Sequence, residues 1–303
     1  MTTAAKTVRK KPRKRWDLFF ISLPLMILVF IFSYLPLLGW SLSFFEYKPG
    51  TPLFANEFVG GKYFELIFNS RDIRRVMTNT IIFAVINFCL LPLPMVFAIM
   101  LNEISSSGFR KITQTLTTLP HFISWIIVYS LAFAIFSTEG LLNELLAMMG
   151  IKPQKLLQDK NAVYWFQTCI SQWKTLGWSS IIYIAAITGI DQELYEAAAV
   201  DGAGKLRCAI HITLPGLLPT FIVIALLAVA NFMNSGLDQY FMFQNAVVMK
   251  KIEVLDLYTY RVGLQNQDYS YATAVGMLKS LISLAMLFTT NAIAKHVRGD
   301  AIV

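Results

Sequence analysis

The chain is divided by a polar stretch, residues 196–215, that reads EAAAVDGAGKLRCAIHITLP. It lies between residues 178–190 and 217–231, two runs apolar enough to lie in a membrane. Its own charged residues make it too polar to cross hydrocarbon. Strong helix formers precede Asp201 and Gly202, and glycine accepts the positive φ with which helices often end. The pattern therefore predicts two short helices joined by a turn, between two membrane segments.

Composition indicates a membrane protein. Hydrophobic residues make up 56% of the 303 residues, and the mean hydropathy is +0.56, outside the usual range of a soluble domain. Such a chain holds several spans of ~20 residues, the length that crosses ~30 Å of hydrocarbon. Much of the net charge of +8 lies in residues 6–15, directly before an apolar run. The positive-inside rule makes this basic run cytoplasmic. Since no aromatic residues are interleaved in it, nucleic-acid binding is not expected.

Apolar runs separated by turn-rich segments predict an all-α integral membrane protein with about six transmembrane helices and both termini cytoplasmic. Residues 1–16 form a basic cytoplasmic segment, and residues 17–303 form the transmembrane domain. The predicted spans are residues 18–45, 76–101, 116–136, 175–190, 214–233 and 271–294. Residues 191–213 are the cytoplasmic loop between spans four and five. The outer loops carry both signs of charge, so the orientation depends on the N-terminal run and on this loop.

Two further segments need an assignment. Residues 18–45 are longer than the core of a cleaved signal peptide, ~7–15 residues, so we expect them to remain as an anchor. In residues 137–174, which we place outside, apolar residues recur at helical spacing over 141–149. This spacing predicts an amphipathic surface helix rather than a span.

The polar stretch resembles the EAA loop of the permease subunits of binding-protein-dependent ABC importers. That loop reads Glu-Ala-Ala, three residues, Gly, nine residues, Ile, one residue and Leu-Pro. The matching residues are Glu196, Ala197, Ala198, Gly202, Ile212, Leu214 and Pro215. In that family the loop forms a coupling helix that docks into a cleft on a cytoplasmic ATPase subunit. The resemblance implies the same role here, which we prefer to a hairpin that only connects two spans.

Docking requires a rigid helix that a partner can approach closely. The two small alanines allow that approach, Gly202 sets the turn, and the acidic and basic side chains offer acceptors and charged donors. The candidate ATPase-coupling residues are Glu196, Ala197, Ala198, Asp201, Gly202, Lys205, Arg207, Leu214 and Pro215.

Other passages resemble the sugar-type permeases, which move oligosaccharides or polysaccharide fragments by alternating access. They are residues 177–183, 189–191, 231–247, 258–261 and 269–274. The resemblance implies a bacterial cytoplasmic membrane, a second homologous permease subunit, two cytoplasmic ATPase subunits that bind Mg-ATP, and an extracytoplasmic solute-binding protein.

We expect no ATPase site, no cofactor and no catalytic residue on the chain itself. Residues 202–205 look like part of a phosphate-binding loop, but Ala199 replaces its first glycine and Leu206 replaces its Ser or Thr. The lone histidines, His121 and His211, have no Cys or carboxylate at ligand spacing, so no metal site is predicted.

The candidate substrate path is defined by polar side chains in or near the last two spans. A Lys inside a span costs ~2.5–3.5 kcal/mol, so Lys279 must pair with a carboxylate, snorkel, or face a cavity and contact substrate. Asn231 and Asn234 share a helix face, and Tyr271 and Ser280 complete the set. Amides and hydroxyls in spans are more often contacts between helices. The lysine and the basic outer loops also raise the hypothesis of an acidic saccharide.

Other classes of protein fit less well. A secondary transporter would need paired halves and intramembrane carboxylates, which the centres of spans two to six lack. A membrane enzyme would need converging catalytic groups in the spans. A permease of the same family for another solute, such as an amino acid or a phosphonate, is the realistic alternative.

Overall fold

The computed structural model describes residues 16–298. Over this range the chain is helical almost throughout, and its only β-pairing is an isolated bridge between Phe45 and Phe58. The predicted all-α membrane protein is confirmed. The basic segment predicted over residues 1–16 lies outside the described residues, except for its last position.

The first half of the chain is a series of helices of very different lengths. They are α1 (Trp16–Val29), η1 (Phe30–Tyr34), η2 (Leu35–Phe44), η3 (Leu53–Ala55), α2 (Lys62–Asn69), α3 (Arg71–Cys89), α4 (Leu93–Asn102), α5 (Ser107–Thr118), η4 (Leu119–Phe122), α6 (Trp125–Phe136) and α7 (Leu141–Met148).

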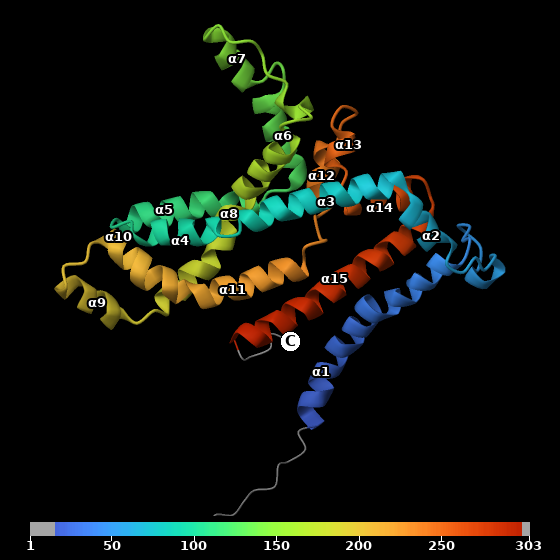
Figure 1. Ribbon diagram of the computed structural model, residues 1–303, viewed down its shortest axis with the longest axis horizontal. Helices are drawn as coiled ribbons and strands as arrows, with labels where there is room; N and C mark the ends of the chain where they lie inside the picture. Colours follow the sequence, from blue (N-terminus) through green and yellow to red (C-terminus); the bar gives the residue numbers. More distant parts are fainter. Residues whose placement is uncertain (1–15, 299–303) are drawn as a thin grey trace, which may run out of the picture.

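The second half contains two long helices, α8 and α15, and several short ones. They are η5 (Leu156–Gln158), α8 (Val163–Thr188), α9 (Gln192–Val200), α10 (Lys205–Cys208), η6 (Ala209–Thr213), α11 (Leu214–Ala230), α12 (Asp238–Phe243), α13 (Met249–Ile252), α14 (Leu255–Tyr260), η7 (Arg261–Gln265) and α15 (Tyr269–Arg298). Figure 1 shows α9 and α10 at one end of the bundle and α2 and α14 at the other.

Five helical stretches among the described residues are long and apolar enough to cross a membrane. They are Phe19–Phe44, Arg71–Asn102, Trp125–Met148, Lys205–Ala230 and Tyr269–Ala292. The predicted fourth span lies in α8, which is not among the five because it is less apolar. With 26 residues at 1.5 Å each, α8 is about 39 Å long. It begins at Val163, inside the segment that the sequence analysis placed outside the membrane.

The region of the predicted third span, residues 116–136, is not one helix. Helix α5 ends at Thr118, a short 3-10 turn contains Pro120, and α6 starts after Ser124, whose hydroxyl accepts the N–H of Ile127. Proline has no N–H to donate, and a serine N-cap starts a new helix, so the chain changes direction here. In Figure 1, α6 and α7 lead away from the layer that contains α4 and α5.

Helix α8 stabilises this break. The Lys174 ammonium donates to the carbonyls of Pro120, His121 and Ile123, over 3.1, 2.7 and 2.7 Å. One turn further along α8, a Cβ on Gly177 would lie 2.3 Å from the backbone of Thr117. Only glycine permits so close an approach of α8 to α5.

Three clusters of buried side chains connect the helices. The first joins α2, α3 and α14 to α15 around Val76. The second joins α3, α6 and α8 to α12–α14 around Phe83 and Ile252. The third joins α4, α8 and α11 around Tyr183 and Leu217. By contrast, the apolar part of the span Phe19–Phe44 buries no residue, and Figure 1 shows α1 at the edge of the bundle. Residues 19–38 are mostly exposed, as lipid-facing residues are.

Candidate functional site

The first candidate site is the coupling segment, residues 191–213, at one end of the bundle. Helix α9 begins after Asp191, whose carboxylate accepts the N–H of Glu193 at 3.0 Å and so caps the helix. The helix ends at Val200, and the N–H groups of Gly202 and Ala203 bond back to its last carbonyls. Gly202 has a φ of +70°, which a side chain would strain. The turn that the sequence predicted is therefore present.

The second helix of this segment is not separate from the membrane span. Helix α10 and the π-helical turn η6 run directly into α11, with Pro215 in its first turn. The Tyr195 hydroxyl lies 2.9 Å from the Thr213 hydroxyl and links α9 to this continuous helix. A displacement of α9 would therefore be transmitted to α11 through this contact and the short turn.

The side chains of the coupling segment are largely free of internal contacts. Glu196, Ala197, Asp201, Gly202 and Arg207 are exposed, as is Pro215; Ala198 and Leu214 are half-buried. Apolar side chains are also exposed in this segment, with Val200 at 89% and Leu206 at 74%. Such a mixture of charged and apolar groups on a capped helix suits a docking surface.

Lys205 is the exception among these residues. Its ammonium donates to the carbonyl of Glu103 at 2.9 Å and to the hydroxyl of Ser105 at 3.0 Å. It thereby ties the coupling segment to the loop between α4 and α5. The sequence analysis had assigned this lysine as a donor toward the ATPase.

The second candidate site is an open cavity of about 810 Å³ between α11, α14 and α15, lined by polar and apolar side chains. Lys279 of α15 projects toward it and forms an ion pair with Asp256 of α14; each side chain is 19% exposed. The other oxygen of Asp256 accepts the N–H groups of Ser235 and Gly236, both at 3.1 Å. Lys279 thus has the internal carboxylate partner that was one of its three interpretations, and it also lines a cavity.

Three of the other candidate path residues line the same cavity. The Asn234 amide donates to the Asn231 side chain at 3.0 Å, and both residues are exposed. Ser280 lies beside Lys279 and donates to the carbonyl of Gly276. Tyr271 does not line it: this side chain is 9% exposed and belongs to the core that joins α14 to α15.

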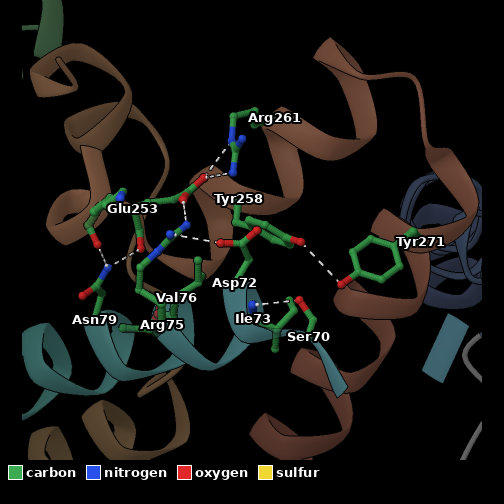
Figure 2. Close-up of polar contacts among 12 residues, drawn as sticks. Ser70, Asp72, Ile73, Arg75, Val76, Asn79, Glu253, Tyr258, Arg261 and Tyr271 are labelled. Carbon is green, nitrogen blue, oxygen red and sulfur yellow. Dashed lines mark hydrogen bonds and ion pairs between the residues drawn. The ribbon is translucent and has the colours of Figure 1, made fainter. Parts of the chain in front are cut away.

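A third arrangement, the carboxylate cluster, consists of Asp72, Arg75, Glu253 and Arg261 (Figure 2). Glu253 is 1% exposed; Arg75 approaches one of its oxygens at 2.9 Å, and the Nε of Arg261 approaches the other at 2.7 Å. Arg75 also lies 3.0 Å from Asp72. Two acids and two bases make the cluster electrically neutral, which is the condition for burying a carboxylate without a large penalty.

Hydrogen bonds extend this cluster into the neighbouring helices. The Asn79 amide donates to the carbonyls of Lys250 and Glu253, both at 3.0 Å, and accepts from the Tyr164 hydroxyl at 2.8 Å. Figure 2 also shows the Tyr258 hydroxyl directed at that of Tyr271, 3.4 Å away. Burial raises the pKa of Tyr258, so its hydroxyl stays neutral and available as a donor.

The sequence analysis missed Asp256 and the carboxylate cluster. In the sequence, Glu253 and Asp256 are only part of the mixed charge of the outer loops. Their spacing in the sequence does not indicate that Glu253 faces α3 and Asp256 faces α15. Within residues 16–298, no group of three His, Cys, Asp or Glu side chains lies close enough to hold a metal ion.

Comparison with known proteins identifies the class. Residues 90–299 match the family described as binding-protein-dependent transport system inner membrane component, and the chain belongs to this family. It is therefore the membrane-embedded permease component of a transport system. Two proteins of Bacillus subtilis (strain 168) are similar over most of their length. Protein LplB is 35% identical over 93% of this chain and 89% of its own.

The second relative is the polygalacturonan/rhamnogalacturonan transport system permease protein YteP, 36% identical over 94% of this chain and 89% of its own. Among solved structures, a bacterial alginate ABC transporter in complex with an alginate pentasaccharide-bound periplasmic protein contains a similar chain. It has a TM-score of 0.86 and 30% sequence identity, and the match covers 95% of this chain and 96% of that one.

Proposed function

We propose that the chain is one permease subunit of an ATP-driven importer that carries saccharides inward across the bacterial cytoplasmic membrane. The observation that carries the proposal is the capped, exposed helix α9, which bears the Glu-Ala-Ala sequence at the end of the bundle where α11 begins. A helix that is rigid, exposed and joined to a span by a short turn is suited to pass a displacement into the membrane. This role does not require an ATPase site on the chain itself.

The complete importer has further subunits in this proposal. A second, homologous permease completes the transport path, two cytoplasmic ATPase subunits hold Mg-ATP, and an extracytoplasmic binding protein delivers the cargo. The periplasmic protein in the similar alginate transporter supports the last of these partners. Both termini and the coupling segment lie in the cytoplasm, and α13 and α14 lie on the outer side.

The cargo is inferred from the cavity and from the relatives together. The cavity offers amides, hydroxyls and one ammonium that is paired with the Asp256 carboxylate; such groups bind sugar hydroxyls and carboxylates. The name of YteP refers to polygalacturonan and rhamnogalacturonan, and that of the solved structure to alginate. A non-sugar anion is the second candidate, because the Lys279 ammonium would also suit a phosphonate.

Transport follows from alternating access. ATP binding closes the two ATPase subunits, which moves the docked α9 helices toward each other. The movement opens the permease pair outward, and the binding protein then releases its saccharide into the cavity. ATP hydrolysis reverses the movement. Each step requires contacts that differ between the two states, and α9 supplies them on the ATPase side.

The proposal is tested by changing the turn behind α9. Gly202→Asp places a side chain at a φ of +70° and alters the docking surface. We expect the variant to reach the membrane in normal amounts while ATP-driven saccharide uptake falls at least ~10-fold, because ~1.4 kcal/mol of lost coupling is tenfold. Gly150→Asp is the matched control: its φ is +72°, it has open space around it, and it follows α7, far from α9.

Two results would contradict the proposal. One is undiminished saccharide uptake in the Gly202→Asp variant. The other is a purified, transport-competent complex that contains no ATPase subunit. Uptake of a phosphonate but of no saccharide by the wild-type complex would favour the second candidate cargo.

A further inference from the structure

The Lys279–Asp256 pair lies on the wall of the cavity and is the one place there where two opposite charges meet among the described residues. We propose that this pair is a masked binding site for a sugar carboxylate. In this structure Asp256 pairs with the Lys279 ammonium, and during transport the carboxylate of an acidic saccharide takes the place of Asp256. The inference rests on the proposed function, because it assumes that saccharide passes through this cavity.

Lys279 needs a carboxylate partner both before and after saccharide binds. Its side chain is 19% exposed within an apolar helix, where an unpaired ammonium is unfavourable. Asp256 is the only carboxylate within ion-pair distance of it in the part of the chain that the structure describes. The Lys279 ammonium has three N–H donors, so it can donate to a second carboxylate before its bond to the first is broken.

Asp256 can give up Lys279 without becoming an unsatisfied charge. Its two oxygens have separate tasks: one faces Lys279, and the other accepts the N–H groups of Ser235 and Gly236. The two N–H groups come from the turn between α11 and α12, so they remain when the ammonium leaves. Exchange therefore breaks one contact of Asp256 and preserves two.

The other polar groups of the cavity suit the rest of an acidic sugar. Asn231 and Asn234 present amides, and Thr259 and Ser280 present hydroxyl oxygens with lone pairs. The hydroxyl protons of Thr259 and Ser280 already bond to backbone carbonyls, at 2.8 and 3.0 Å, which leaves those oxygens as acceptors for sugar hydroxyls. These neutral groups around the Lys279–Asp256 pair are suited to the hydroxyls of a uronate residue.

The exchange also gives a rule for specificity. A neutral sugar hydroxyl cannot replace a carboxylate at the ammonium, because Lys279 would then have no negative partner, whereas Asp256 keeps its two N–H bonds in either case. A sugar that carries its own carboxylate gives Lys279 a new carboxylate partner in place of Asp256. Lys279 is therefore a specificity-determining residue, and Asp256 is the internal competitor that excludes neutral saccharides.

The experiment compares two forms of one oligosaccharide: oligogalacturonate, and the same oligomer with its carboxylates reduced to alcohols. The complete complex, with its second permease, ATPases and binding protein, is reconstituted in proteoliposomes, and uptake of both forms is measured. We expect Lys279→Gln to lower the ratio of acidic to reduced uptake about tenfold, equivalent to ~1.4 kcal/mol. Asp256→Asn removes the competitor, so the acidic oligomer should then half-saturate uptake at a several-fold lower concentration.

Two further variants keep the test decisive. Lys250→Gln removes an exposed lysine on the same outer side and should leave the ratio unchanged. If Lys279→Gln alone does not assemble, the neutral double variant, Lys279→Gln with Asp256→Asn, removes both charges together. It should assemble and show the same loss of preference.

The outcomes separate the inference from the proposed function. If wild type and the Lys279→Gln or double variant transport the two forms in the same ratio, the inference is overturned while saccharide import stands. A wild-type complex that transports neither form but responds to another solute would remove the proposed function as well.

Discussion

The coupling segment and the carboxylate cluster differ in where their partners lie. In the coupling segment the candidate coupling residues are nearly consecutive and most side chains are exposed, up to 89% for Val200. In the carboxylate cluster, Glu253 is 1% exposed, and its partner Arg75 is 178 residues away in the sequence. A surface that a separate protein binds can be encoded in one short stretch. A contact inside the fold joins distant positions, so changes there should affect the stability of the chain itself.

The largest effect is expected at the centre of the carboxylate cluster. Glu253→Ala leaves Arg75 and Arg261 facing each other without the carboxylate between them. Breaking a buried ion pair typically costs ~3–5 kcal/mol, and we expect the lower part of this range because both arginines are about one-third exposed. Unfolding of the purified subunit in mixed micelles measures the change. The control is Glu144→Ala, an exposed acid of α7; equal effects of the two changes would refute the comparison.

A smaller loss is expected next to the cluster. Asn79→Ala removes two donated hydrogen bonds and one accepted bond, all to groups in or beside the core. Leaving buried partners unsatisfied costs ~1–3 kcal/mol. The same unfolding measurement, with the exposed Asn161→Ala as control, tests this value. A loss of unfolding free energy smaller than that of the control would contradict this prediction. It would mean that water reaches this region and bonds to the groups that the Asn79 amide had satisfied.

In the coupling segment, Tyr195→Phe should affect stability little and coupling more. The change removes only the 2.9 Å contact with Thr213, worth ~0.5–1.5 kcal/mol. Because this contact joins α9 to η6, we expect transported saccharide per ATP hydrolysed to fall while the amount of assembled complex stays normal. Tyr34→Phe, at an exposed position of η1, is the control. Unchanged coupling would show that the backbone turn alone transmits the movement.

Lys205→Ala should have the smallest effect on stability. Its ammonium contacts Glu103 and Ser105, but the side chain is 66% exposed, and contacts of that kind contribute ~0–1 kcal/mol. Unfolding in mixed micelles should place this variant within that range of wild type. A loss as large as that of Asn79→Ala would break the comparison, because the coupling segment would then be part of the folded core.

The sequence predicted the coupling segment well because its pattern is local. Helix formers, Gly202 and Pro215 each act on the backbone within one or two turns. The structure has a helix, a positive φ and the first turn of α11 at these places, although α11 continues directly from η6. The all-helical membrane fold was also predictable, since apolar runs of sufficient length have few other solutions. The roles of these residues in docking stay predictions.

The cavity and the carboxylate cluster could be predicted only in part. The cost of an intramembrane lysine pointed to a carboxylate partner for Lys279, but nothing in the pattern identified Asp256, which lies 23 residues away on a different helix. The break at Pro120 was hidden for the same reason, because its stabilising contact comes from Lys174, 54 residues later. Pairings over such distances are fixed by how helices pack and not by local preference.

The contact of Lys174 with three carbonyls has a consequence for how the protein is made. Synthesis runs from the N-terminus, so the carbonyls at Pro120, His121 and Ile123 are already in place when Lys174 leaves the ribosome. The three carbonyls that accept from the Lys174 ammonium are thus synthesised before Lys174. We expect residues 163–188 to integrate poorly into a bilayer on their own and efficiently when residues 107–136 come before them. Earlier helices would then serve as a template for the entry of a later one.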